Sequence, residues 1–132
     1  MCSLGDIILV DAYKHAGREL SRHSFVVISN ESGKIQGLDY NLVCNVLSSF
    51  KNDQQRAKKL GYPGNFGVTH NDTIIPKGNE KDGFVKAEQL YYFNTDKLNY
   101  IVIGSMRPEV FNNLLEFISN LDVPIVEFTD NL

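Results

Sequence analysis

Arg22 and the basic residues before it form the part of this chain best suited to bind a phosphate group. Arg22 begins the run Arg-His-Ser-Phe-Val-Val-Ile-Ser-Asn, residues 22–30, and it follows the polar segment 14–21, which contains Lys14 and Arg18. A guanidinium at the end of a rigid strand, preceded by a mobile basic loop, suits an anionic, phosphate-bearing ligand. The alternative is that Arg22 caps a sheet edge and pairs with a surface carboxylate.

Two histidines near Arg22 could add acid–base chemistry, because imidazole titrates at about pH 6.5. Adjacent residues in a regular strand point to opposite faces, so Arg22 and His23 cannot both face one site. A packed or exposed histidine is therefore the alternative for His23. His15 lies in the expected loop, from which it could swing over a substrate. His70 falls in an expected turn, and we expect it to be structural.

Length and composition indicate one domain. The chain has 132 residues, of which 42% are hydrophobic, enough to bury a core without disulfides or metal. No apolar run approaches the roughly 18 residues that a membrane span needs. The first residues do not read as a signal peptide. Cys2 and Cys44 make no disulfide framework, and Cys44 is expected in the core. A reduced, cytoplasmic setting is the expectation.

The net charge of −3 argues weakly against nucleic-acid binding, but the charge is unevenly distributed. Residues 1–59 carry a balance of +2, whereas residues 60–132 carry −5. An acidic half does not prevent RNA binding if the basic residues converge on one face. The densest basic group is Arg56-Ala-Lys58-Lys59. The alternative is that this basic group is only the solvated face of a helix.

The hydrophobic pattern predicts short strands joined by turns, followed by one helix. The first three strands, at 5–11, 24–29 and 42–47, are separated by a loop at 12–21 and a turn at 30–34. Such a meander builds an antiparallel sheet. A polar insertion with a short helix is expected at 51–66. Further strands are expected at 66–69, 73–76, 84–93 and 99–104, with an exposed loop at 77–83. The chain closes with a tail at 122–132, which contains an expected strand at 125–128. A helix opens at Pro108 with apolar residues at spacings of three and four.

Four segments, in order along the chain, resemble the MazF/PemK toxins. Gly-Asp-Ile-Ile-Leu-Val at 5–10, followed by a loop and then residues 22–30, resembles the family's "GDI-x-x-V" and "R-P-x-x-V-I-x-N". The later matches are the third strand running into Ser48, the segment 84–90 followed by Thr95-Asp-Lys-Leu98, and the strand and helix at 104–121. The resemblance covers nearly the whole chain apart from the insertion and the tail.

This resemblance implies a mainly β fold with a C-terminal α-helix, an SH3-like small antiparallel barrel of the CcdB/PemK/MazF type, usually a homodimer. It also implies a metal-independent endoribonuclease without cofactor, which cleaves single-stranded RNA (mRNA) and is silenced by an antitoxin protein. Arg22 matches the family's catalytic arginine, and Ser48 matches its catalytic Thr or Ser. Gln89 matches the glutamine of the third motif, and with Ser49 it is an expected substrate contact.

Two positions depart from the family pattern. His23 replaces the proline that follows the arginine, and Leu90 and Tyr91 follow Gln89 where the family has an arginine. An RNA or antitoxin contact made by that arginine would be absent.

RNA cleavage through its own 2′-hydroxyl needs a base, charge stabilisation on the phosphorane and an acid for the leaving oxygen. Arg22 could hold the non-bridging oxygens and Ser48 could donate to the phosphate, although Ser48 could equally be a strand-end turn hydroxyl. Lys14 and Arg18 are candidate backbone contacts. We find no cluster of Asp, Glu and His residues with the spacing typical of metal ligands. The competing hypotheses are a non-catalytic, CcdB-like protein-binding toxin and an inactive relative.

Overall fold

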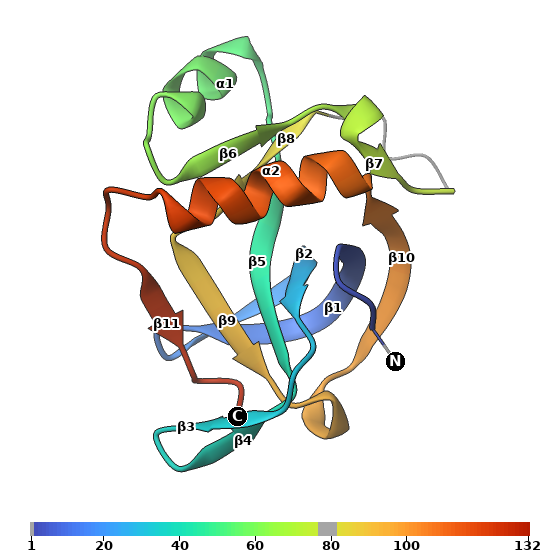
Figure 1. The fold of residues 1–132 in the computed structure, drawn as a ribbon, viewed down its shortest axis with the longest axis vertical. Helices are drawn as coiled ribbons and strands as arrows, with labels where there is room; N and C mark the ends of the chain where they lie inside the picture. The colour runs from blue at the N-terminus through green and yellow to red at the C-terminus, as the bar shows by residue number, and fades with distance from the viewer. Residues whose placement is uncertain (1, 77–81) are drawn as a thin grey trace.

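The computed structural model describes residues 2–76 and 82–132, and its fold is mainly β with two α-helices (Figure 1). The strands are β1 (Asp6–His15), β2 (Arg18–Ser29), β3 (Gly33–Ile35), β4 (Leu38–Tyr40), β5 (Leu42–Ser49), β6 (Asn65–Val68), β7 (Thr73–Ile74), β8 (Gly83–Lys86), β9 (Gln89–Phe93), β10 (Tyr100–Met106) and β11 (Val126–Phe128). The helices are α1 (Asp53–Leu60) and α2 (Pro108–Ser119). The prediction of a mainly β chain with a helix after the last long strand is confirmed.

One large sheet organises the molecule, in the order β11-β9-β5-β2-β1-β10-β7. Its neighbours are antiparallel, except that β11 runs parallel to β9. β5 is the centre: it pairs with β2 along one edge and with β9 and then β8 along the other, while β6 pairs with β8. The predicted antiparallel meander is confirmed. Within the described ranges, however, the strand pairing follows an open path and does not close into a barrel.

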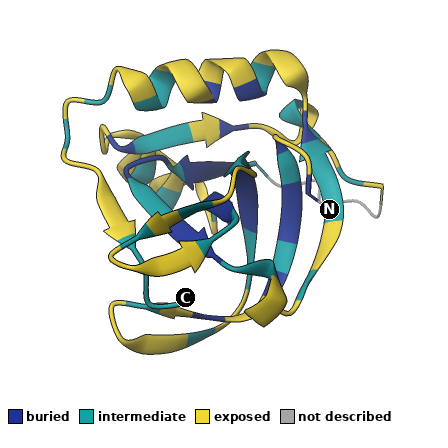
Figure 2. Ribbon diagram, turned by 60° about the horizontal axis from the view of Figure 1, so that its bottom comes forward, coloured by how far each residue is buried: buried dark blue, intermediate teal, exposed yellow. Residues whose placement is uncertain are grey.

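The two faces of the sheet carry separate hydrophobic clusters, because neighbouring residues on a strand point to opposite sides. Ile8, Phe25 and Cys44 belong to an aromatic-rich cluster that includes Tyr91 and Phe93. Ile7 and its neighbours on the other face pack under α2. Figure 2 shows the buried residues concentrated in the central strands and on the inner side of α2. Cys44 is fully buried, as expected for a small core residue.

The predicted loop at 12–21 is wrong, because β1 and β2 continue as a hairpin through it. β1 ends at His15 and β2 begins at Arg18, and these two residues pair with each other. Ala16 and Gly17 form the two-residue turn, with φ angles of 49° and 81°, the positive values that a tight hairpin turn requires. Its polar residues face solvent, which made the hairpin look like a loop in the sequence.

The insertion at 51–66 contains the expected short surface helix. Asn52 caps α1 by accepting a hydrogen bond from the Gln55 N–H at 2.8 Å, and Gly61 follows the helix. α2 also begins as expected, with Pro108 in its first turn and Glu109 complementing the positive helix end.

Other boundaries differ from the predicted ones. The single strand region expected at 84–93 is divided into β8 and β9 by a corner at Ala87-Glu88. The turn expected at 30–34 leads into the separate β3–β4 hairpin. The strand expected in the tail exists as β11. The loop expected at 77–83 lies mostly outside the described residues, since only its last two positions are described.

Replacing Leu114 by alanine should lower the free energy of unfolding by about 3 kcal/mol, because its fully buried side chain fills the space between α2 and the sheet. Leu115, its neighbour on α2, is 39% exposed and gives the matched control. Leu115→Ala should cost less than about 1 kcal/mol. Urea unfolding of both variants measures the difference, and equal losses would show that α2 does not pack as described.

Candidate functional site

The structure does not bring Arg22 and Ser48 together. The Arg22 guanidinium is 66% exposed and pairs with Asp11 on β1, with 3.1 Å between Nη2 and Oδ1. Asp11 also accepts a hydrogen bond from the Asn99 side chain at 2.8 Å. The alternative expectation that Arg22 pairs with a surface carboxylate is therefore confirmed, but Arg22 lies within β2, which runs between β1 and β5, and not at the expected strand end. The expected pairing of Arg22 with Ser48 at one site is not found.

His23 occupies the position beside Ser48 instead. Its Nε2 lies 3.0 Å from Ser48 Oγ. Ser24 pairs with Leu47 in the β2–β5 ladder, so the next pair outward places His23 opposite Ser48. Their side chains share one face, and Arg22 points to the other because strand residues alternate. The sequence argument that Arg22 and His23 cannot face the same site holds, and His23 is the one that meets the hydroxyl.

The surroundings of His23 favour its neutral form. The ring lies edge-on to Tyr13 and Phe25, with centroid distances of 6.1 and 6.3 Å. Burial lowers the pKa of His23 below its ordinary value, and the positive charge of Lys86 lowers the pKa further. A neutral, half-buried imidazole can accept a proton at neutral pH. Tyr13 itself is buried in the core and is not available for base stacking.

Lys86 is a site residue that the sequence did not reveal. Phe84 pairs directly with Ser48 across β8 and β5, and Lys86, two residues further, shares its face. Burial lowers the pKa of Lys86, the charge of Lys59 lowers the pKa further, and Glu88 opposes both effects. Nothing in the local sequence marks Lys86, since its role depends on a contact between strands nearly forty residues apart.

The basic group on α1 lies over aromatic rings next to this pair. Phe50 stacks on Phe84 at a centroid distance of 5.2 Å. The Arg56 guanidinium lies 5.9 Å from the Phe50 ring centre, and Lys59 Nζ lies 5.9 Å from that of Phe84. Cations at that distance are attracted by the ring faces. The alternative reading of this group as only a solvated helix face is therefore incomplete, because two of its cations pack on the edge of the site.

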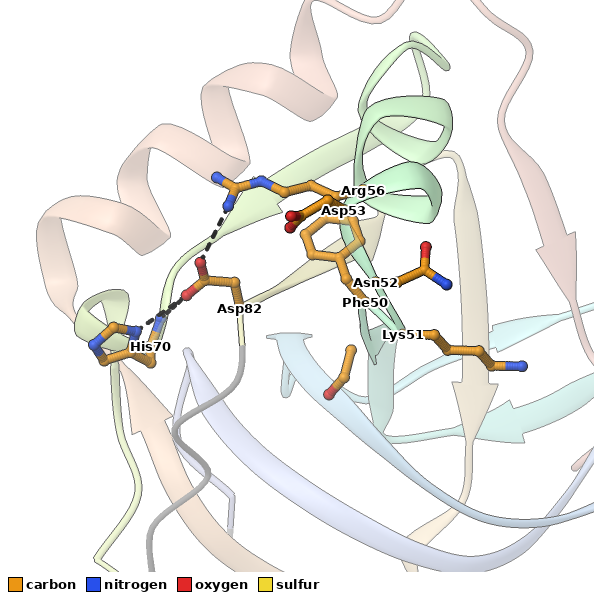
Figure 3. Close-up of a pocket in the computed structure, with 8 residues that line it drawn as sticks. Phe50, Lys51, Asn52, Asp53, Arg56, His70 and Asp82 are labelled. Atoms are coloured by element: carbon orange, nitrogen blue, oxygen red, sulfur yellow. Dashed lines mark hydrogen bonds and ion pairs between the residues drawn. The ribbon is translucent and has the colours of Figure 1, made fainter.

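An open pocket of about 800 Å³ lies between α1 and the start of β8 (Figure 3). Asp82 accepts hydrogen bonds from the His70 backbone N–H at 2.9 Å and pairs with the His70 ring at 3.1 Å. Arg56 lies 3.4 Å from its other oxygen. The His70 hydrogen bonds hold the pKa of Asp82 below its ordinary value. His70, expected to be structural, therefore lines this pocket and is held by Asp82. Ser49, predicted to bind substrate, lines the same pocket.

The remaining predicted residues lie elsewhere. His15 is hydrogen-bonded to the Tyr91 hydroxyl and lies against Phe128, with 4.6 Å between ring centroids, so it does not swing freely. Lys14 and Arg18 are exposed at the hairpin end. Arg18 is five residues from His23 along β2, about 16 Å at the usual strand rise. Gln89 lines a second pocket beyond Lys86.

No protein-family model matches the chain, and no curated protein matches its sequence. Among the residues described, no group of three or more His, Cys, Asp or Glu side chains is arranged to hold a metal ion. None of the described helices has the length and apolarity that crossing a bilayer requires.

The pKa of His23 should lie below the ordinary histidine value and should rise when Lys86 is replaced by glutamine, because the cationic neighbour is then removed. An NMR titration of the imidazole signals measures this. Lys58→Gln is the matched control, since Lys58 is not among the charges that act on His23. A His23 pKa that does not respond to Lys86→Gln would show that the two groups are not neighbours.

Proposed function

We propose that this protein is a metal-independent endoribonuclease of the MazF/PemK toxin type. It cleaves single-stranded RNA, including mRNA, by attack of a 2′-hydroxyl, leaving a 2′,3′-cyclic phosphate and a 5′-hydroxyl. The observation that carries the proposal is the His23–Ser48 pair beside Lys86, at the edge of a basic and aromatic surface. An SH3-like fold of the CcdB/PemK type, a homodimer, a cytoplasmic setting and a neutralising antitoxin protein belong to the same proposal.

The geometry supports a defined division of roles. When His23 Nε2–H donates to Ser48 Oγ, the Nδ1 lone pair is available to take the proton from the 2′-hydroxyl. The bond from O2′ to phosphorus then forms, and the bond from phosphorus to O5′ breaks. The Ser48 hydroxyl donates to a phosphate oxygen, and the Lys86 ammonium stabilises the charge of the phosphorane. An ammonium with a lowered pKa is also a better proton donor to the leaving O5′.

The electrostatics favour a phosphodiester over an ester or amide. A serine and a histidine at 3.0 Å also resemble the nucleophile and base of acyl-transfer enzymes. In those enzymes an acidic group orients the histidine and stabilises the imidazolium. Here the charged group that acts on His23 is Lys86, which disfavours the imidazolium. A bound phosphate oxygen between the two groups would offset that repulsion, whereas a neutral acyl substrate would not.

The competing proposal is a non-catalytic, CcdB-like toxin that acts by binding a protein. The feature that favours it is the exposed apolar surface of β10, where Ile101 and Val102 are 60% and 49% exposed. The two proposals predict different outcomes for RNA, so one experiment separates them.

Purified protein should cleave a long single-stranded RNA in the presence of EDTA, and His23→Ala should reduce the rate by about 10²- to 10⁴-fold, because it removes the general base. Ser48→Ala should reduce the rate about tenfold or more, since it loses a hydrogen bond to the phosphate. Denaturing gels give the rates, and end analysis of the products should show a 2′,3′-cyclic phosphate.

Arg22→Ala is the matched control, because Arg22 is adjacent to His23 in the sequence but points to the other face. It should retain activity within about threefold. A large loss in Arg22→Ala, with full activity in His23→Ala, would overturn the assigned roles. Intact RNA with the wild-type protein would overturn the nuclease proposal and leave the protein-binding one.

A further inference from the structure

A second pocket, which we call the Glu88 pocket, is lined by Lys86 and by the two residues Glu88 and Gln89 near the corner that follows it. Its volume is about 420 Å³, and it lies among α1, β6 and the corner between β8 and β9. It is lined by Lys58, Lys59, Tyr62, Asn65, Lys86, Glu88 and Gln89. Three lysines therefore line a pocket that also contains an aromatic residue, a carboxylate and two amides, of which the Asn65 nitrogen already donates to the Lys59 carbonyl.

Glu88 is the unusual member of this set. The residue is only 7% exposed, and its Oε2 is buried without a hydrogen-bond partner in the described parts of the chain. The carboxylate lies against Gly64, where a Cβ atom would come within 2.4 Å of Oε2. A buried carboxylate oxygen without a donor costs free energy. Gly64 covers Oε2 in this structure, so a ligand that brings donors to both oxygens of the carboxylate must open that contact. Pairing the buried oxygen would offset the cost of the opening.

The other groups in the pocket further restrict which kind of ligand could bind there. The Tyr91 hydroxyl donates to Gln89 Oε1 at 3.4 Å, so the amide nitrogen of Gln89 is the part left to donate to a ligand. Tyr62 is 46% exposed and offers its ring for stacking. The pocket thus combines a carboxylate acceptor, an amide donor, an aromatic surface and lysines. Proteins recognise unpaired bases in RNA by stacking and by hydrogen bonds to the Watson–Crick edge, with cations on the phosphate.

We propose that the Glu88 pocket binds a guanine nucleotide. Guanine carries two adjacent donors, N1–H and the 2-amino group, which suit the two oxygens of one carboxylate, and next to them the O6 acceptor, which suits an amide or ammonium donor. Adenine and cytosine each present a single exocyclic amino group on that edge, and uracil presents one N–H. The carboxylate therefore selects guanine, and the lysines hold its phosphate.

Lys86 links the pocket to the His23–Ser48 pair, because it lines the pocket and lies on β8 two residues from Phe84, the cross-strand partner of Ser48. If the nuclease proposal holds, on which this extension rests, a guanosine bound in the pocket lies next to the phosphodiester that is cleaved. Cleavage would then occur beside a guanosine. Binding of the nucleotide itself does not depend on catalysis.

Titration of the wild-type protein with 5′-GMP, 5′-IMP, 5′-AMP and 5′-CMP, followed by NMR chemical shifts, tests the pocket directly. GMP should bind about tenfold more tightly than AMP or CMP, because one bidentate pair discriminates by roughly that factor or more. IMP lacks the 2-amino group and should bind with intermediate affinity. Equal binding of all four would indicate a phosphate site only, and no binding would indicate no nucleotide site; both results overturn the proposal.

Glu88→Gln should abolish the preference for GMP, whereas Glu116→Gln, an exposed carboxylate on α2, is the matched control and should leave it unchanged. Tyr62→Ala provides a second variant at an exposed position, which should weaken GMP binding about fivefold or more if the ring stacks on the base. A Glu88→Gln protein that is folded by circular dichroism and still prefers GMP would overturn the assignment. GMP binding without RNA cleavage would refute only the nuclease. Cleavage without GMP binding, at sites unrelated to guanosine, would refute only the pocket.

Discussion

The buried carboxamide of Asn45 fixes the corner on which both candidate sites depend. Asn45 lies at the centre of β5 with no solvent exposure, and its Nδ2 donates to the Gln89 carbonyl at 2.8 Å. The carbonyls of Lys86 and Ala87 are 3.4 and 3.5 Å away. These contacts of Nδ2 hold the end of β8 and the start of β9 against β5, whereas Asn45 Oδ1 is buried without a hydrogen-bond partner in the described parts of the chain. Lys86 and Gln89, which flank the corner, both line the Glu88 pocket. One interior side chain therefore helps to hold two of the residues that line this pocket.

The fold brings together basic residues that lie far apart in the sequence. The chain is acidic overall, yet α1 carries Arg56 and Lys59 to the surface where β8 supplies Lys86. These cations come from segments with opposite charge balance in the sequence, and the fold concentrates them. Burial lowers the pKa of Lys86, and repulsion from Lys59 lowers the pKa further. A polyanion that binds there would relieve this repulsion, so a local basic surface can coexist with a negative total charge.

The sequence predicted the helices and strands that are encoded by residues close to one another in the chain. α2 followed from Pro108 and its apolar spacing, and the central strands followed from their β-branched runs. The β1–β2 hairpin was missed because most of its outer residues are polar, apart from Tyr13 and Leu20, which pair with each other and pack on the core. The site was only partly predictable for a different reason. Strand alternation separated Arg22 from His23, but which of them meets Ser48 depends on the β2–β5 register, which shifts at a bulge between Val27 and Ser29. Such a register is a property of two strands together, and no local pattern contains it.

Because β11 covers one end of the sheet, the two ends differ in how readily they could pair with an added strand. β11 covers the side of β9 that faces away from β5, and it is only three residues long and carries Glu127. A short, charged edge is a poor template for adding another chain. At the opposite end, β7 pairs with β10 only at Ser105 and Met106, so within residues 2–76 and 82–132 most of β10 has no strand partner on that side. Among the described end strands of the main path, β10 therefore offers a longer uncovered edge for strand addition than β9 does. Two copies of this chain paired through β10 would cover that edge in both copies, so such a pair could not extend further through it.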